Sequence, residues 1–240
     1  MVLVFQMSDA PNIAGNVGPT AYEAWRNSVL GDITETVEQR LIFELAGEVA
    51  GRAVLDVGCG DGTLALAAWQ RGARVTGVDP DPHMLPAARN KARILGAPVT
   101  FLQARGERLP FPDQCFDIVF AVTVLCFVED AVAFLREVAR VLRPGGRLVI
   151  GELNKSSYWA VRRRLRGWFG SALWRSARFR TASEMRALAQ RAGLTVGDVR
   201  GAVFYPPLGA LARLMAPIDA KLGRITTFGA AFIAVQATRR

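Results

Sequence analysis

The sequence contains few of the residues that build metal centres and disulfide frameworks. Its 240 residues include 3 cysteines and one histidine, and their spacing matches neither a zinc site nor a disulfide scaffold, so we predict no metal. It also lacks any run of about 18 uncharged apolar residues, and the apolar run at residues 2–5 is too short for a secretory signal. These absences argue against a membrane-spanning helix and a secreted disulfide scaffold, and we expect a cytoplasmic protein with reduced thiols.

Acidic residues are scarce in the last part of the chain. Residues 151–240 contain 16 Lys or Arg against 4 Asp or Glu, a net charge of +12, whereas residues 1–150 contain 14 against 17, a net charge of −3. Coding bias explains why 27 of the 30 basic residues are Arg, but it does not explain this asymmetry. A basic C-terminal third indicates an acidic partner, which could be an anionic substrate, a membrane surface or nucleic acid.

Short apolar runs and longer amphipathic stretches alternate from about residue 52 onwards. This alternation predicts α/β units on a parallel sheet covered on both faces. The expected strands lie at residues 52–57, 73–78, 99–103, 116–122 and 147–153, and the expected helices at 61–71, 82–95 and 131–142. Two further strands, at 195–205 and 227–238, have room only for a Pro-rich, partly helical return between them, so we predict that they are antiparallel. The expected fold is therefore a Rossmann-like, doubly wound sheet of seven strands with the last one antiparallel.

The length suits one large domain, which we place at residues 51–240, after an N-terminal helical segment at 1–50. Residues 154–180 form an insertion between the fifth strand and a helix at 181–192 that Thr181 and Glu184 are expected to cap. The insertion has apolar and Trp residues on one helical face and Arg residues on the other. That face is either an ordinary hydrophobic one or a lid above an apolar substrate.

A glycine-rich turn lies between the first strand and the helix after it, in the sequence VLDVGCGDGTL at residues 54–64. A G-x-G-x-G turn at this position exposes backbone N–H groups to a nucleoside cofactor. A Walker loop is excluded because no Gly-Lys-Ser/Thr follows, and Thr63 stands where the dinucleotide fingerprint has its third glycine. The turn therefore predicts a cofactor with a nucleoside but argues against a pyrophosphate.

Two acids flank this turn at the ends of neighbouring strands. Asp56 precedes the glycines, where a carboxylate can accept a hydrogen bond from a cationic amino group. Asp79 ends the second strand, where an acid can accept hydrogen bonds from ribose hydroxyls. The alternative for Asp79 is a cap on the next helix, a role for which Asp81 is better placed.

Four motifs in order carry a family resemblance: VLDVGCGDGTL, GVDPDPHML, ERLPFPDQCFDIVF and LREVARVLRPGGRLVIGE. Together they resemble class I S-adenosylmethionine-dependent methyltransferases, and within them the small-molecule branch that includes the ubiquinone and menaquinone biosynthesis enzymes. The segment AYEAW at residues 21–25, with Gly31 and Glu38, is similar to the N-terminal helices that lie over the cofactor in this branch. The resemblance covers residues 20–153. It implies S-adenosyl-L-methionine as cofactor, S-adenosyl-L-homocysteine as product and a seven-stranded sheet that agrees with the strand count.

The resemblance also implies a set of cofactor-binding positions. Glycines of the turn would approach the methionine part, Asp79 would hold the ribose, and Met84 would lie against the adenine. The full set is Asp56, Gly58, Cys59, Gly60, Asp79, Pro80, Met84, Gly106, Glu107, Val122 and Leu125. One position departs from the family: Arg105 stands where an acid commonly accepts from the adenine amino group, and Glu107 is the candidate replacement.

Candidates for contact with the methyl acceptor are Tyr22, Trp25, Cys126, Trp159 and Arg178. Each has an ordinary alternative: core packing for Tyr22 and Trp25, a small buried residue for Cys126, a hydrophobic helix face for Trp159 and a solvated position for Arg178. We assign no catalytic base, because positioning and desolvation can drive methyl transfer from a sulfonium without one.

The sequence thus predicts an enzyme that transfers a methyl group to a small, apolar or lipid-like acceptor and that makes peripheral contact with anionic membranes. One alternative is an RNA or other nucleic-acid methyltransferase, suggested by the basic C-terminal third but disfavoured because no RNA-binding module is recognisable. The other is a non-catalytic cofactor-binding protein at anionic membrane surfaces, suggested by Arg105 and the basic insertion. The methylated atom and the oligomeric state stay open.

Overall fold

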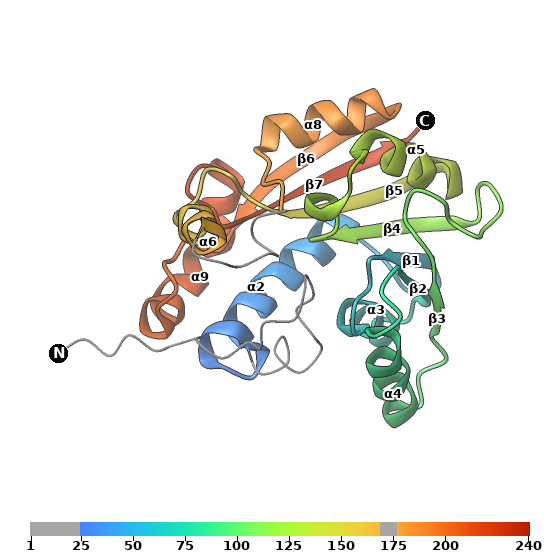
Figure 1. Cartoon of the computed structure of the whole chain (residues 1–240), viewed down its shortest axis with the longest axis horizontal. Coiled ribbons are helices and arrows are strands. Elements are labelled where there is room, and N and C mark those ends of the chain that lie inside the picture. The colour runs from blue at the N-terminus through green and yellow to red at the C-terminus, as the bar shows by residue number, and fades with distance from the viewer. Residues whose placement is uncertain (1–24, 169–176) are drawn as a thin grey trace.

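The computed structural model describes residues 25–168 and 177–240 and contains a seven-stranded sheet in the order β3-β2-β1-β4-β5-β7-β6 (Figure 1). Strand β7 is antiparallel to both β5 and β6, and the other neighbouring pairs are parallel. This confirms the predicted sheet with an antiparallel last strand. The strands are β1 (Ala53–Val57), β2 (Arg74–Asp79), β3 (Thr100–Gln103), β4 (Phe116–Val122), β5 (Leu142–Leu153), β6 (Leu194–Ala202) and β7 (Phe232–Arg239).

Helices cover both faces of the sheet. Helices α2, α3, α4 and α9 share one core with it, and α5 and α8 share the other. Strand β1 shows the reason, because Val54 faces the first core whereas Leu55 and Val57 face the second, as the alternation of a strand requires. The helices are α2 (Val29–Ala46), α3 (Thr63–Gln70), α4 (Leu85–Leu95), α5 (Ala131–Val141), α6 (Tyr158–Trp168), α8 (Ala182–Arg191) and α9 (Gly209–Ile225), with a short 3-10 helix, η1 (Leu125–Phe127).

Several boundaries differ from the prediction for local reasons. Helix α4 begins at Leu85 and not at residue 82, and Asp81 does not cap it, because its Oδ1 accepts from the His83 N–H within the preceding turn, at 2.9 Å. Strand β5 begins at Leu142 and not at residue 147, since a bulge in its pairing with β4 absorbs the Pro-Gly-Gly sequence. The predicted cap of α8 is confirmed, with Thr181 and Glu184 forming a capping box.

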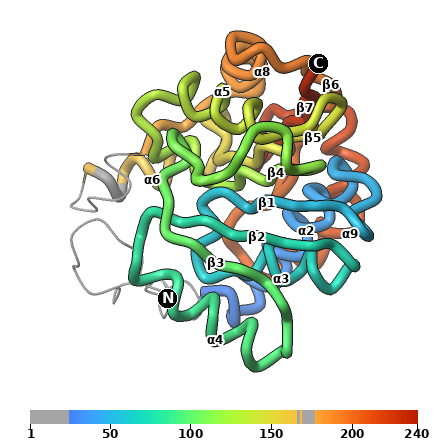
Figure 2. The backbone as a smooth tube through the Cα atoms, turned by 90° about the vertical axis from the view of Figure 1, so that its right-hand side faces the viewer, coloured from blue at the N-terminus to red at the C-terminus, as the bar shows by residue number. Residues whose placement is uncertain are grey.

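The parallel strands bring several loops to one edge of the sheet. Figure 2 shows the strands following one another from β7 at the top to β3 at the bottom. Because parallel strands end at the same edge, the glycine turn after β1, Asp79 at the end of β2, η1 after β4 and the insertion after β5 all lie there. Across the two described ranges, no helix has the length and hydropathy needed to cross a bilayer.

Candidate functional site

The glycine turn packs closely against the segment that follows β4. Its three glycines have positive φ angles, with 75° at Gly58, and a side chain there would bring its Cβ within 2.8 Å of the Val124 side chain. The N–H groups of Gly58 and Cys59 both donate to the Val78 carbonyl, at 2.8 and 3.0 Å. Only glycine satisfies both the angle and the space, so this sequence fixes the turn between β1, β2 and β4.

Asp79 ties the glycine turn to the end of β2. Its Oδ2 accepts from the Gly60 N–H at 2.8 Å, and its Oδ1 accepts from the Asp81 N–H at 2.9 Å. Burial raises the pKa of Asp79, while these two hydrogen bonds oppose the rise. Met84 lies over the same turn, because a Cβ at Gly60 would lie 3.4 Å from the Met84 Cε.

Asp56 has an oxygen that nothing in the described part of the chain binds. The residue is 2% exposed, and its Oδ2 has no hydrogen-bond partner among the described residues. Burial, reinforced by the charge of Asp79, raises the pKa of Asp56 to about 7. A buried polar atom without a partner costs free energy, so this oxygen marks a place where a ligand's donor group fits.

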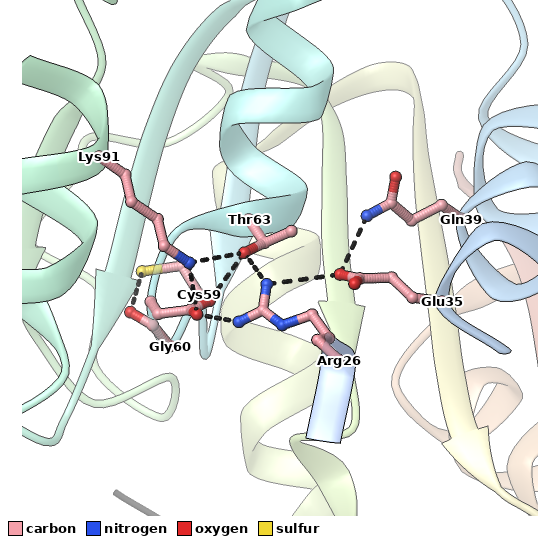
Figure 3. Close-up of polar contacts among 8 residues, drawn as sticks. Arg26, Glu35, Gln39, Cys59, Gly60, Thr63 and Lys91 are labelled. Atoms are coloured by element: carbon pink, nitrogen blue, oxygen red, sulfur yellow. Dashed lines mark hydrogen bonds and ion pairs between the residues drawn. The ribbon is translucent and has the colours of Figure 1, made fainter. Parts of the chain in front are cut away.

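A buried ionic network lies next to the turn (Figure 3). Arg26 donates to Asp61 and Thr63, and Lys91 of α4 donates to the same Asp61 oxygen at 2.7 Å. Burial pulls the pKa of Asp61 upward, but Lys91 and Arg26 outweigh it and hold the pKa below its usual value. Glu35 of α2 lies 3.5 Å from the Arg26 guanidinium. The network joins the N-terminal region to the turn, and our sequence reasoning missed it because no local pattern pairs residues 35 positions apart.

The remaining cofactor candidates lie along the same edge. Gly106 is buried against Phe134 after β3, and Val122 and Leu125 follow each other at the end of β4. Arg105 is 76% exposed and lies 3.8 Å from the Glu107 carboxyl group, so its guanidinium points to solvent. The other positions, Cys59, Gly60, Pro80 and Met84, surround the turn and the end of β2.

Four of the five candidates for contact with the methyl acceptor lie within the described residues. Tyr22 lies outside the described residues, and Trp25 is half-buried where the described chain begins. Cys126 is 1% exposed, burial raises the pKa of its thiol, and its carbonyl accepts from the Arg178 N–H at 2.9 Å. Trp159 is buried on α6, and its Nε1 donates to the Tyr205 carbonyl at 2.8 Å. Among the described candidates, Cys126 and Arg178 are thus in direct contact with each other.

The insertion at 154–180 leaves and re-enters the fold at one place. The Lys155 N–H donates to the Arg180 carbonyl at 3.0 Å, and an Arg180 guanidinium N–H donates to the Leu125 carbonyl at 2.7 Å. The apolar face that the sequence predicts for α6 is exposed. The helix packs through another side, where Trp159 points inward. The exposed residues are Tyr158, Val161, Leu165 and Trp168. Residues 169–176 of the insertion lie outside the described residues.

Glu152 is a buried acid at the end of β5 that the sequence reasoning did not single out. It is 1% exposed, and its Oε1 accepts from the Cys126 N–H at 3.2 Å. Burial raises the pKa of Glu152 to about 7, while Arg180 opposes the rise. Its place on an inward-facing strand position was the only available signal, and such positions usually hold apolar residues.

We expect Glu152 to make stability depend on pH. Since its pKa rises from 4.5 to about 7 on folding, the protonated form is favoured, and the stabilisation present below pH 4.5 is lost as the pH rises through 7. Glu152→Gln removes this titration but keeps an acceptor for the Cys126 N–H. Urea unfolding should show the variant gaining about 2–3 kcal/mol on the wild type between pH 5 and pH 8. Parallel pH profiles, or the same gain in the exposed control Glu48→Gln, would contradict this.

Comparisons with known proteins agree with this geometry. A family model described as a methyltransferase domain matches residues 55–150. Demethylmenaquinone methyltransferase of Tropheryma whipplei is 40% identical over 128 residues, so the match spans about half of either chain, 53% of each. Ubiquinone biosynthesis O-methyltransferase of Aeromonas salmonicida is 32% identical over 185 residues, which are 74% of this chain and 77% of that protein. A Thermotoga maritima structure, described as a possible histamine N-methyltransferase, has a TM-score of 0.72 at 23% identity over 92% of this chain and 95% of that one, a likeness of fold alone.

The sheet order, the antiparallel last strand and the glycine turn after β1 define the Rossmann-like methyltransferase fold. The chain belongs to the class I S-adenosylmethionine-dependent methyltransferases and is similar to their quinone-biosynthesis branch.

Proposed function

We propose that this protein transfers a methyl group from S-adenosyl-L-methionine to a small, apolar or lipid-like acceptor of the quinone type. The observation that carries the proposal is the Oδ2 of buried Asp56, which has no hydrogen-bond partner among the described residues, beside a glycine turn of positive φ. A carboxylate oxygen there suits a ligand that offers a cationic amino group, and the methionine part of the cofactor has one.

The residues around the turn would hold the cofactor. Asp56 would accept from its amino group, the glycine N–H groups would face its methionine part, and Asp79 has lone pairs left for ribose hydroxyls. Met84 would lie on the adenine, and Glu107 would take the place of the acid that Arg105 replaces. The bound cofactor supplies an electrophilic methyl group on a sulfonium.

The chain's own contribution would be positioning and exclusion of water. The insertion begins after the end of β5 and is hydrogen-bonded to η1, which follows β4. It therefore begins and ends at the edge of the sheet where the glycine turn lies. We propose that it acts as a lid and that residues 25–50 attach the N-terminal segment over the same edge through Arg26. An enclosed apolar site raises the rate by orienting the acceptor and removing its water. The names of the relatives favour a quinone precursor as that acceptor.

Two measurements, made one after the other, test the proposal. Calorimetric titration should show binding of S-adenosylmethionine and of S-adenosylhomocysteine in the micromolar range, roughly 8 kcal/mol of binding free energy. Methyl-labelled cofactor should then transfer label to a demethylated quinone or phenol and not to RNA. Label on RNA would favour the nucleic-acid alternative, and binding without transfer to any acceptor would favour the non-catalytic one. A folded protein that binds neither cofactor form would overturn the proposal.

A further inference from the structure

Helix α6 carries an exposed apolar stripe that nothing in the described structure covers. Tyr158, Val161, Leu165 and Trp168 follow one another at helical spacing and are 63%, 53%, 47% and 86% exposed. A large apolar side chain left in water on one helix is ordinary, but four in a row on one face mark a contact surface.

Helix α9, which packs on β6 beside α2, carries a second such stripe. Leu214, Ile218 and Ile225 share one face and are 73%, 48% and 83% exposed. Helix α6 follows β5 and α9 follows β6, two strands that run in the same direction, so the chain enters both helices from the edge where the parallel strands end, and Figure 1 shows both helices at its left. The residues after α9 meet those before α6, because Gly229 N–H donates to the Ser156 carbonyl at 3.1 Å.

The exposed charges of α6 and α9 themselves have one sign. Helix α6 contains no acid, and Arg162 and Arg164 flank its stripe on either side. The single acid of α9, Asp219, is 1% exposed and points inward, with its oxygens accepting from the N–H groups of Val203 and Phe204. Lys221 is exposed on the same face of α9. An ordinary solvated helix mixes both signs of charge, whereas apolar residues edged only by bases are typical of helices that lie on anionic bilayers.

We propose that the two stripes, together with Arg162, Arg164 and Lys221, form a docking surface for an anionic phospholipid bilayer. Trp168 and the aliphatic residues would enter the headgroup region, and the basic residues would pair with lipid phosphates. A second copy of this chain fits less well, because it would bring an equally basic surface against this one. Nucleic acid would use the bases but leave the apolar stripes in water.

Docking in this orientation turns the edge with the glycine turn and the insertion toward the bilayer. A lipid-like acceptor would then reach the site without crossing water, a consequence that rests on the proposed function. The docking surface itself does not rest on it, since vesicle binding needs neither cofactor nor acceptor.

The test is co-sedimentation of the full chain with phosphatidylcholine vesicles that contain or lack phosphatidylglycerol. We expect binding only to the anionic vesicles, weakened at high salt, and lowered about tenfold or more by Arg162→Glu with Arg164→Glu and by Val161→Ser with Trp168→Ser. The matched control is Ile94→Ser, which removes a 67% exposed apolar residue from α4, a helix that lies apart from α6 and α9 in Figures 1 and 2, and should bind as the wild type does.

Several outcomes would overturn the proposal. They are equal binding to both vesicle types, unchanged binding in the two double variants, and an equal loss in Ile94→Ser. Two further outcomes would assign the surface to another partner. One is a dimer in sedimentation velocity that dissociates in the Val161→Ser, Trp168→Ser variant. The other is RNA binding that this variant loses, in a protein that does not bind anionic vesicles. Arg162 is half-buried and the other changed residues are exposed, and an unchanged urea midpoint would show that the fold of each variant is intact.

Discussion

Asp79→Ala is expected to lower the affinity for S-adenosylmethionine about 100-fold or more. The carboxylate accepts from the N–H groups of Gly60 and Asp81, so its removal frees the glycine turn from β2 as well as removing the proposed ribose contact. Hydrogen bonds to a charged group contribute about 1.5–3 kcal/mol each, and about 1.4 kcal/mol corresponds to a tenfold change in affinity. Calorimetric titration with both cofactor forms measures the loss.

Two further variants separate a local loss from general damage. Asp79→Asn keeps one acceptor oxygen for the turn, so its affinity should lie between those of the wild type and the alanine variant. Asp198→Ala removes a 61% exposed acid on β6 and should bind the cofactor normally. If Asp79→Ala stayed folded and bound as tightly as the wild type, the site at the end of β2 would not be the nucleoside site.

Most of the fold was predictable because it depends on local patterns. Short apolar runs predicted the strands and the period of about 3.6 predicted the helices, and the glycines of the turn indicated the edge of the sheet where the site lies. A predicted boundary was wrong where a side chain makes an unforeseen local hydrogen bond. Asp81, for example, accepts from the His83 N–H and does not cap α4.

The parts of the site that escaped prediction are contacts between distant residues. Arg26 and Asp61 are each unremarkable in their own segments, and only folding brings them together. Glu152 lies in a part of β5 that is buried on both faces, where apolar side chains are expected, and only folding brings Arg180 and Cys126 next to it. The face of α6 was identified correctly as apolar, but its burial could not be known, because the pattern does not say whether a partner covers it.

The pair Arg26 and Asp61 should be the strongest single polar contact between the N-terminal region and the glycine turn. Their side chains are only 9% and 6% exposed, and removing one partner of a buried ion pair costs about 3–5 kcal/mol. We expect Arg26→Ala to lower the free energy of unfolding by about 3 kcal/mol, the lower end, because Lys91 still pairs with Asp61 at 2.7 Å. Urea unfolding measures this loss.

A double-mutant cycle isolates the pair itself. Combining Arg26→Ala with Asp61→Asn should give a coupling energy of about 2–3 kcal/mol, since two residues of one buried network interact strongly. The matched control is Arg40 with Glu44, an Arg–acid pair on α2 whose arginine is 65% exposed and whose coupling should stay below about 0.5 kcal/mol. A coupling no larger than that of the control would mean that the N-terminal region and the turn fold independently. A coupling of the expected size would make them one cooperative unit, so that ordering the turn around a ligand would also order the segment proposed to cover it.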